Sequence, residues 1–161
     1  MTKTLIRFVT GLVLPALIIA AGTARSAPAQ DMPEVEVVKT ANDAFYKALS
    51  TKNMGLLVSL WSYRTEIRHI GPRNVEVNVG LDAAIRNWER LFATFPGFKI
   101  TCKEGYVRIN GSTAWVTGIE TAQWKNDAGD TVTATQFGTN IFEKQDGRWV
   151  LVFHHGSTIP Q

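Results

Sequence analysis

Two histidines are the first candidates for chemistry in this chain, because histidine is the side chain whose charge changes closest to neutral pH. His69 alternates with Ile67 within residues 66–70, so the two side chains share one face of an extended strand. His155 ends the strand-like run 148–155, on the face that carries Trp149, Leu151 and Phe153, which we take as the inner one. Each histidine is either a general acid/base in a pocket or a structural group.

The adjacent pair His154-His155 raises the question of a metal site. Neighbouring strand residues point to opposite faces, so the two imidazoles cannot easily bind one ion, and we expect His154 at the outer surface. No cysteine or carboxylate cluster stands at the spacing of metal ligands. We therefore predict no metal and no other cofactor.

A second group of residues is suited to bind a ligand. Trp61 and Trp88 fall on apolar helix faces, where they belong to the core or to a pocket wall. Gln136 and Asn140 share one face of a predicted strand, so their amides either bind a ligand or lie on a dimer face. Glu120 is a base or a histidine partner if it points inward, and a cross-strand partner if it points outward. Both faces of its strand are mixed, and we favour the outward position.

The sequence also indicates the surroundings of one arginine and of the single cysteine. Arg73 follows Gly71-Pro72, where it either binds an anionic ligand near an opening or lies in solvent, as loop arginines mostly do. Cys102 is the single cysteine, which excludes an internal disulfide, and its place among strand residues indicates a buried thiol.

Three helices and six strands are expected to position these residues. Apolar residues recur at three- and four-residue steps in 34–49, 54–61 and 81–95, which predicts helices. Alternating or β-branched runs predict strands at 66–70, 75–79, 98–109, 113–124, 131–142 and 148–155. In the third strand the apolar alternation switches near Glu104-Gly105, which indicates a bulge. The order indicates an α+β fold, with three helices covering one face of a curved antiparallel sheet.

The first 29 residues read as a secretion signal peptide. Lys3 and Arg7 precede an apolar run from Phe8 to Ala21, and Ala27-Pro-Ala29 offers small residues for cleavage. The run is too short for a spanning helix, so we expect a periplasmic or secreted protein without stable membrane insertion. The mature domain, residues 30–161, would carry 14 basic and 14 acidic residues. With equal numbers of basic and acidic residues, the mature domain has no excess positive charge to bind nucleic acid, and we expect none as a partner.

Several separated motifs resemble the SnoaL-like branch of the NTF2-like superfamily. They begin with Trp61, Glu66-Ile-Arg-His-Ile-Gly-Pro-Arg73, and Val79-Gly80 before a helix with Trp88. Thr113-Ala-Trp-Val-Thr-Gly118, Asp146-Gly-Arg-Trp149 and His155-Gly-Ser157 follow. The resemblance covers roughly residues 36–159. It implies a cone-shaped barrel, a pocket between sheet and helices, and a homodimer formed through the outer sheet surface.

The resemblance does not select one activity, because a single fold hosts many unrelated functions. The Asp, Tyr and protonated Asp of ketosteroid isomerase relatives, and the Asp-Arg-Asp set of epoxide hydrolase relatives, have no counterpart in this chain. Three hypotheses remain: a domain that binds a small, mostly apolar molecule, an isomerase, dehydratase or hydrolase that uses His69 or His155, and an oligomerisation or adaptor module with a vestigial pocket.

Overall fold

The computed structural model describes residues 32–159 of the chain. Within this part, the helices and strands follow the predicted order. The helices are α1 (Met32–Ser50), α2 (Met54–Ser59) and α3 (Leu81–Thr94). The strands are β1 (Arg68–Ile70), β2 (Asn78–Val79), β3 (Lys99–Asn110), β4 (Thr113–Lys125), β5 (Thr131–Gln145) and β6 (Arg148–Thr158). The predicted leader, residues 1–29, lies outside the described residues.

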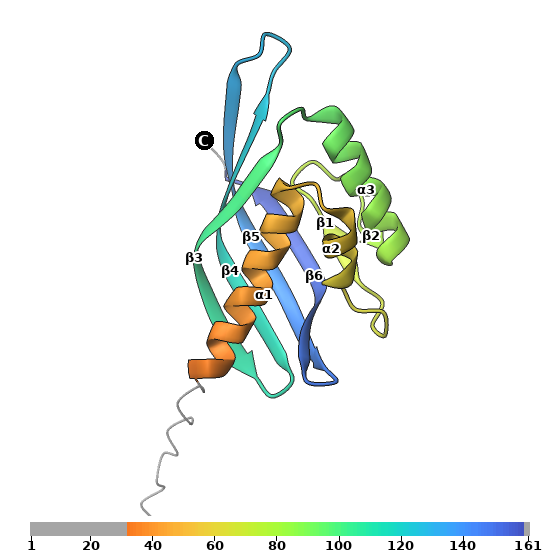
Figure 1. The fold of residues 1–161 in the computed structure, drawn as a ribbon, viewed down its shortest axis with the longest axis vertical. Coiled ribbons are helices and arrows are strands. Elements are labelled where there is room, and N and C mark those ends of the chain that lie inside the picture. The colour runs from red at the N-terminus through yellow and green to blue at the C-terminus, as the bar shows by residue number, and fades with distance from the viewer. Residues whose placement is uncertain (1–31, 160–161) are drawn as a thin grey trace, which may run out of the picture.

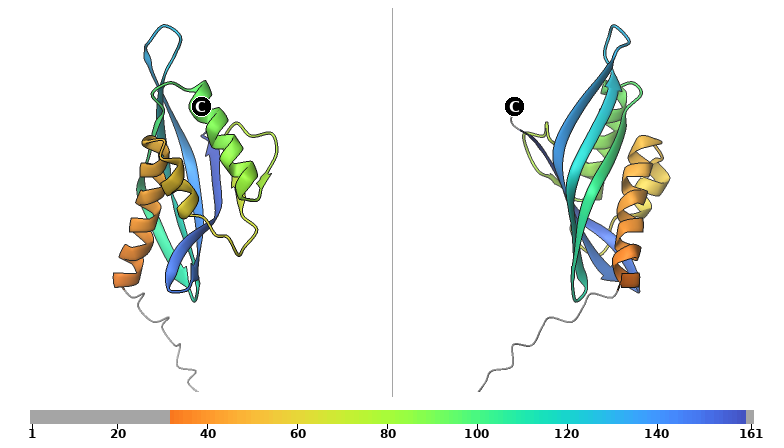
Figure 2. Two further views of the ribbon diagram at one scale, coloured as in Figure 1. Left: turned by 45° about the vertical axis from the view of Figure 1, so that its right-hand side comes forward. Right: turned by 90° about the vertical axis from the view of Figure 1, so that its left-hand side faces the viewer.

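The strands form one curved sheet in the order β2-β1-β6-β5-β4-β3, and the three helices lie on one side of it (Figures 1 and 2). Strands β3 to β6 form an antiparallel meander. Strand β1 runs parallel to β6, so the sheet is mixed. The two end strands, β2 and β3, do not pair, and the sheet therefore stays open. The predicted α+β architecture is confirmed.

Helix α1 covers the concave face of the sheet because its apolar residues recur on one side. Val38, Phe45 and Leu49 are buried there. Ser50 anchors the end of the helix to β3: its Oγ donates a hydrogen bond to the carbonyl oxygen of Ile100 at 2.7 Å and accepts one from the Ile100 amide at 2.9 Å. None of the helices in the described part combines the length and apolarity needed to cross a membrane.

Helix α3 begins after Gly80, whose φ of 82° is a conformation that glycine adopts without strain. Ala84 and Trp88, one turn apart, are its buried residues. The Trp88 ring lies 5.4 Å from Trp61 and 6.4 Å from Phe45, so three aromatic rings join α3 to the end of α2 and to α1. Helix α3 lies on the same side of the sheet as α1 and α2 (Figure 1).

Two irregularities change the alternation of side chains in the sheet. The first lies in β3 between Lys103 and Tyr106, where a bulge was predicted. The second lies in β6, where Phe142 pairs with Leu151 while Ile141 pairs with Phe153, which leaves Val152 as the extra residue. A bulge of one residue moves every following side chain to the other face. This second bulge decides which histidine of β6 points inward.

Candidate active site

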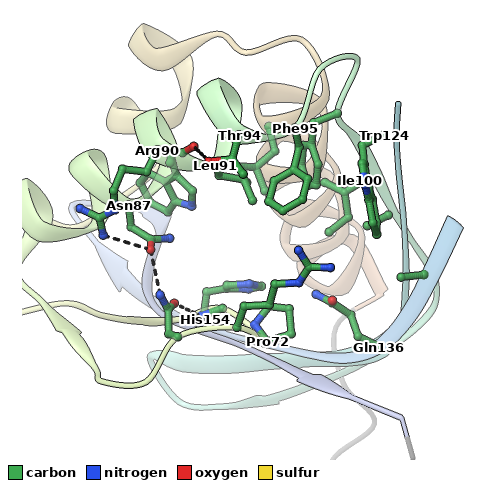
Figure 3. A pocket seen from close by; sticks show the side chains of 18 of the residues that line it. Pro72, Asn87, Arg90, Leu91, Thr94, Phe95, Ile100, Trp124, Gln136 and His154 are labelled. Atoms are coloured by element: carbon green, nitrogen blue, oxygen red, sulfur yellow. Dashed lines mark hydrogen bonds between the residues drawn. The ribbon is translucent and has the colours of Figure 1, made fainter. Parts of the chain in front are cut away.

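A cavity of about 510 Å³ lies between the concave sheet face and α3 (Figure 3). Most of its wall is apolar and includes Leu49, Trp88, Leu91, Phe95, Phe98 and Ile100. Polar side chains also contribute to the wall, among them His69 of β1, Asn87 of α3, Gln136 of β5 and His154 of β6. Figure 3 shows Leu91 and Phe95 on one side and Gln136 and His154 on the other. Size and lining are typical of a small-molecule pocket, for which volumes of roughly 300–1,000 Å³ are usual.

A chain of hydrogen bonds between amide groups determines which ring nitrogen of His69 carries the proton. The backbone amide of Gly71 donates to Asn74 Oδ1, so Asn74 Nδ2 is the group that donates to Asn87 Oδ1 at 2.8 Å. Asn87 Nδ2 then donates to His69 Nε2 at 3.0 Å. The neutral ring therefore carries its proton on Nδ1. That nitrogen is buried and has no hydrogen-bond acceptor within residues 32–159.

His154, and not His155, points into the interior. The extra residue Val152 reverses the alternation beyond it, so the predicted positions of the two histidines were wrong. His154 is 4% exposed and lines the cavity, whereas His155 is half-buried beside Phe153 and is not part of the cavity wall. The sequence pattern hides the bulge because positions 149–153 are all apolar.

Hydrogen bonds orient the His154 ring and leave one of its two nitrogens, Nε2, able to accept a proton. Asn140 Nδ2 donates to Asn42 Oδ1 at 2.8 Å and to the Tyr46 hydroxyl at 3.1 Å. Asn140 Oδ1 therefore accepts a 2.8 Å hydrogen bond from His154 Nδ1. The lone pair of His154 is thus on Nε2, since the hydrogen bond of this ring within residues 32–159 is formed by Nδ1. An imidazole oriented in this way can act as a general base.

The two inward histidines stack on each other and are neutral. Their ring centroids lie 5.2 Å apart with an interplanar angle of 15°. Burial lowers the pKa of His154 to about 3, with a smaller contribution from the charge of His155. Burial likewise lowers the pKa of His69, and His154 adds to this effect. The 3.9 Å approach of His154 Nδ1 to Glu120 Oε1 is therefore a contact with a neutral ring and not an ion pair.

Glu120 lies in the interior, so the favoured outward position was wrong. It is fully buried, and its carboxyl group accepts hydrogen bonds from the Tyr46 hydroxyl at 2.7 Å and from Gln136 Nε2 at 2.5 Å. Burial raises the pKa of the Glu120 carboxyl group, although these two hydrogen bonds oppose the shift. Gly138 on the neighbouring strand makes room for it, because a Cβ atom there would come within 2.6 Å of Glu120 Cδ.

The remaining predicted site residues separate into two groups. Gln136 and Trp88 line the cavity, with Gln136 between the open space and Glu120. Asn140 and Trp61 are buried but are not part of the wall; Asn140 orients His154, and Trp61 packs against the ring of His69 at 6.4 Å. The amides of β5 therefore face inward.

Sequence reasoning missed three polar contributors, namely Asn42, Tyr46 and Asn87. Asn42 and Tyr46 lie on α1 among apolar residues and are 4% and 5% exposed. A polar residue on the apolar face of a helix is a usable signal, because it must find a buried partner. Asn87 lies directly before Trp88 and offers no such signal. Within residues 32–159, no group of three or more histidine, cysteine, aspartate or glutamate side chains is placed to hold a metal ion.

The sequence of residues 38–161 matches the SnoaL-like domain family. The chain belongs to this family. Among curated proteins, this SnoaL-like domain is similar to the F-box protein SKIP8 of Arabidopsis thaliana, with 27% identity over 120 residues. The match covers 74% of this chain and 48% of SKIP8, so the chain spans about half the length of its curated relative.

Solved structures support the same fold. A proposed dehydratase of the NTF2-like family from Streptomyces avermitilis is 25% identical with a TM-score of 0.73, covering 80% of this chain and 99% of that one. The CamKII hub homology domain of Chlamydomonas reinhardtii is 24% identical with a TM-score of 0.66, covering 79% and 98%. A ketosteroid isomerase-like protein from Erwinia carotovora atroseptica is 19% identical with a TM-score of 0.67, covering 81% and 100%. This SnoaL-like domain thus has an NTF2-like fold.

Proposed function

We propose that this SnoaL-like domain is an exported protein that binds a small, mostly apolar molecule in its cavity. The observation that supports the proposal is the cavity itself, a mostly apolar space of about 510 Å³ whose wall also contains polar side chains such as Asn87, Gln136 and His154. An apolar pocket with a few convergent polar groups is the usual form of a ligand site. Export rests on the signal-like leader, residues 1–29.

The binding proposal is tested with 2-naphthamide, a neutral, flat and mostly apolar probe. Isothermal titration calorimetry measures its binding to the purified protein and to an Ala122→Leu variant, whose larger side chain extends from the cavity wall. We expect saturable binding to the wild type and at least a tenfold loss in the variant. Circular dichroism verifies that the variant is folded. Equal binding by both proteins would contradict the use of this cavity.

A second candidate, acid–base catalysis, is supported by the orientation of His154. An amide holds its Nδ1–H, and its Nε2 lone pair belongs to a ring at the cavity wall. A base placed so can remove a proton next to a carbonyl group, which is a step shared by isomerases and many dehydratases. The substitution for this role is His154→Asn, because the asparagine amide can replace Nδ1–H while Nε2 is lost.

General-base catalysis by His154 is tested by proton exchange in D₂O. NMR follows the loss of the α-protons of 2-tetralone, an apolar bicyclic ketone, in the presence of the protein. We expect enzyme-dependent exchange that falls by about 100-fold or more in His154→Asn, the range found for general bases. His155→Asn is the matched control on the outer face. An equal fall in the exchange rate in His154→Asn and His155→Asn would contradict the proposal that His154 is the general base.

We also propose that the domain is a homodimer formed through its outer sheet face. Tyr106 and Phe137 are 61% and 50% exposed there, and exposed apolar groups of this kind often mark protein contacts. The similarity to a hub homology domain is compatible with assembly. Multi-angle light scattering tests this, with a dimer mass expected for the wild type and a monomer mass for Phe137→Lys. A monomeric wild type would refute it.

A further inference from the structure

Arg73, in the loop after β1, is held at the edge of the cavity by two aromatic rings. Its Cζ atom lies 4.9 Å from the ring centroid of Phe95 and 5.4 Å from that of Trp124. The two rings are themselves 5.3 Å apart in an edge-on arrangement. All three residues line the cavity, although they come from the β1–β2 loop, the end of α3 and the end of β4. The guanidinium group is therefore positioned by packing.

The hydrogen-bond donors of Arg73 have no carboxylate partner in the described chain. The ion pairs between residues 32 and 159 involve other lysines and arginines, and Arg73 is in none of them. An aromatic ring offers no oxygen lone pair to an N–H group. A stacked guanidinium thus keeps its planar fork of donors, whose geometry fits the two oxygens of a carboxylate.

The charge of the described cavity wall also favours an anion. Arg73 and Arg90 contribute two positive charges, and no aspartate or glutamate of residues 32–159 lines the wall. His69 and His154 add no charge, because burial keeps both rings neutral. The nearest interior acid, Glu120, is separated from the cavity by Gln136, and burial raises the pKa of its carboxyl group. Two arginines at exposed positions of the wall, with no carboxylate of the described residues facing them there, favour an anionic ligand at this edge of the cavity.

The apolar wall separates this charged edge from a polar one. Leu91, Phe98, Ile100 and Ala122 contribute apolar surface to the wall, and Gln136 and His154 provide hydrogen-bonding groups to it. In addition to the proposed function, on which this inference rests, we propose that the natural ligand is an amphipathic carboxylic acid with an aromatic or alicyclic body. Its carboxylate binds Arg73, and its apolar body fills the cavity.

The test compares 2-naphthoate with 2-naphthamide, two probes of nearly equal shape that differ in charge. Calorimetry on the purified protein should give a dissociation constant about 10- to 100-fold lower for the carboxylate, the range of a charge-assisted hydrogen-bonded pair. Arg73→Gln should abolish this preference and change amide binding less than threefold. Arg73→Lys should recover only part of it, since lysine cannot form the planar two-point contact.

Two control variants make the outcomes distinct. Arg148→Gln, at an exposed position at the start of β6, should keep the full preference. A preference that disappears in Arg90→Gln and persists in Arg73→Gln would overturn the assignment to Arg73. Equal affinity of the wild type for both probes would overturn the carboxylate inference while leaving the binding proposal intact. Failure of both probes to bind would overturn the binding proposal together with this inference.

Discussion

Replacement of His154 by asparagine should make the protein less sensitive to acid. The ring is buried, and its pKa is about 3 in the folded protein against an ordinary value of 6.5. The unfolded chain therefore binds this proton more tightly than the folded chain. The stability that the neutral ring contributes is complete above pH 6.5 and is lost as the pH falls toward 3.

The size of the effect follows from the two pKa values. Between pH 7.5 and 5.0, protonation of the unfolded form lowers the free energy of unfolding by about 2 kcal/mol for His154 alone. His69 acts in the same direction, because its pKa is also lowered. Glu120 acts in the opposite direction: its pKa is raised, so its contribution is lost as the pH rises above 4.5. Both residues are present in the variant as well, so the effects of burial on their pKa values cancel in the comparison. The smaller contribution of His154 to the lowered pKa of His69 is lost in the variant, which changes the pH dependence in the same direction as the loss of His154 itself.

Urea unfolding at several pH values between 5.0 and 7.5 measures the difference. The free energy of unfolding of His154→Asn should fall about 2 kcal/mol less over this range than that of the wild type. The variant will be less stable at pH 7.5 because ring contacts with Phe45 and His69 are lost, so the pH dependence is compared and not the absolute stability. His155→Asn should retain most of the His154 contribution, because burial is the larger cause of the lowered pKa of His154. An unchanged pH dependence in His154→Asn would refute the buried neutral histidine.

Two further substitutions test the interior network around Glu120. Gly138→Ala should lower the free energy of unfolding by about 2–4 kcal/mol, because its methyl group displaces the hydrogen-bonded Glu120 side chain. Gly55→Ala, whose Cβ would make only an ordinary contact with Asn53 Oδ1 at 3.6 Å, should be neutral or slightly stabilising. Urea unfolding that shows no loss of stability in Gly138→Ala would contradict the close approach of Glu120 to Gly138. Tyr46→Phe should cost about 1–3 kcal/mol, because Glu120 loses a donor and Asn140 an acceptor, and an unchanged midpoint would show that the hydroxyl is not needed.

The order of the helices and strands and the α+β fold could be predicted from the sequence, whereas the parallel pairing of β1 with β6, in a sheet predicted to be antiparallel, could not. Periodicity in α1 and α3 and alternation in β3 to β5 are local properties, and each is repeated over several turns or residue pairs. The bulge between Lys103 and Tyr106 could also be predicted, because the apolar side chains change parity there, from Ile100 and Cys102 to Val107 and Ile109. His69 was expected on the same strand face as Ile67, and both side chains are buried in the structure.

The orientation of the site residues was decided by tertiary structure. Glu120 lies on a strand whose two faces are equally mixed, and its burial depends on space beside Gly138 and on a hydroxyl from α1, 74 residues earlier. His154 turns inward because of one extra residue, Val152, in a run where every neighbour is apolar. The alternation of apolar and polar residues indicates which side chains are buried. Where consecutive residues are all apolar there is no alternation, so a bulge leaves no sign in the sequence. Partners that meet only after folding complete the site, and no local pattern contains them.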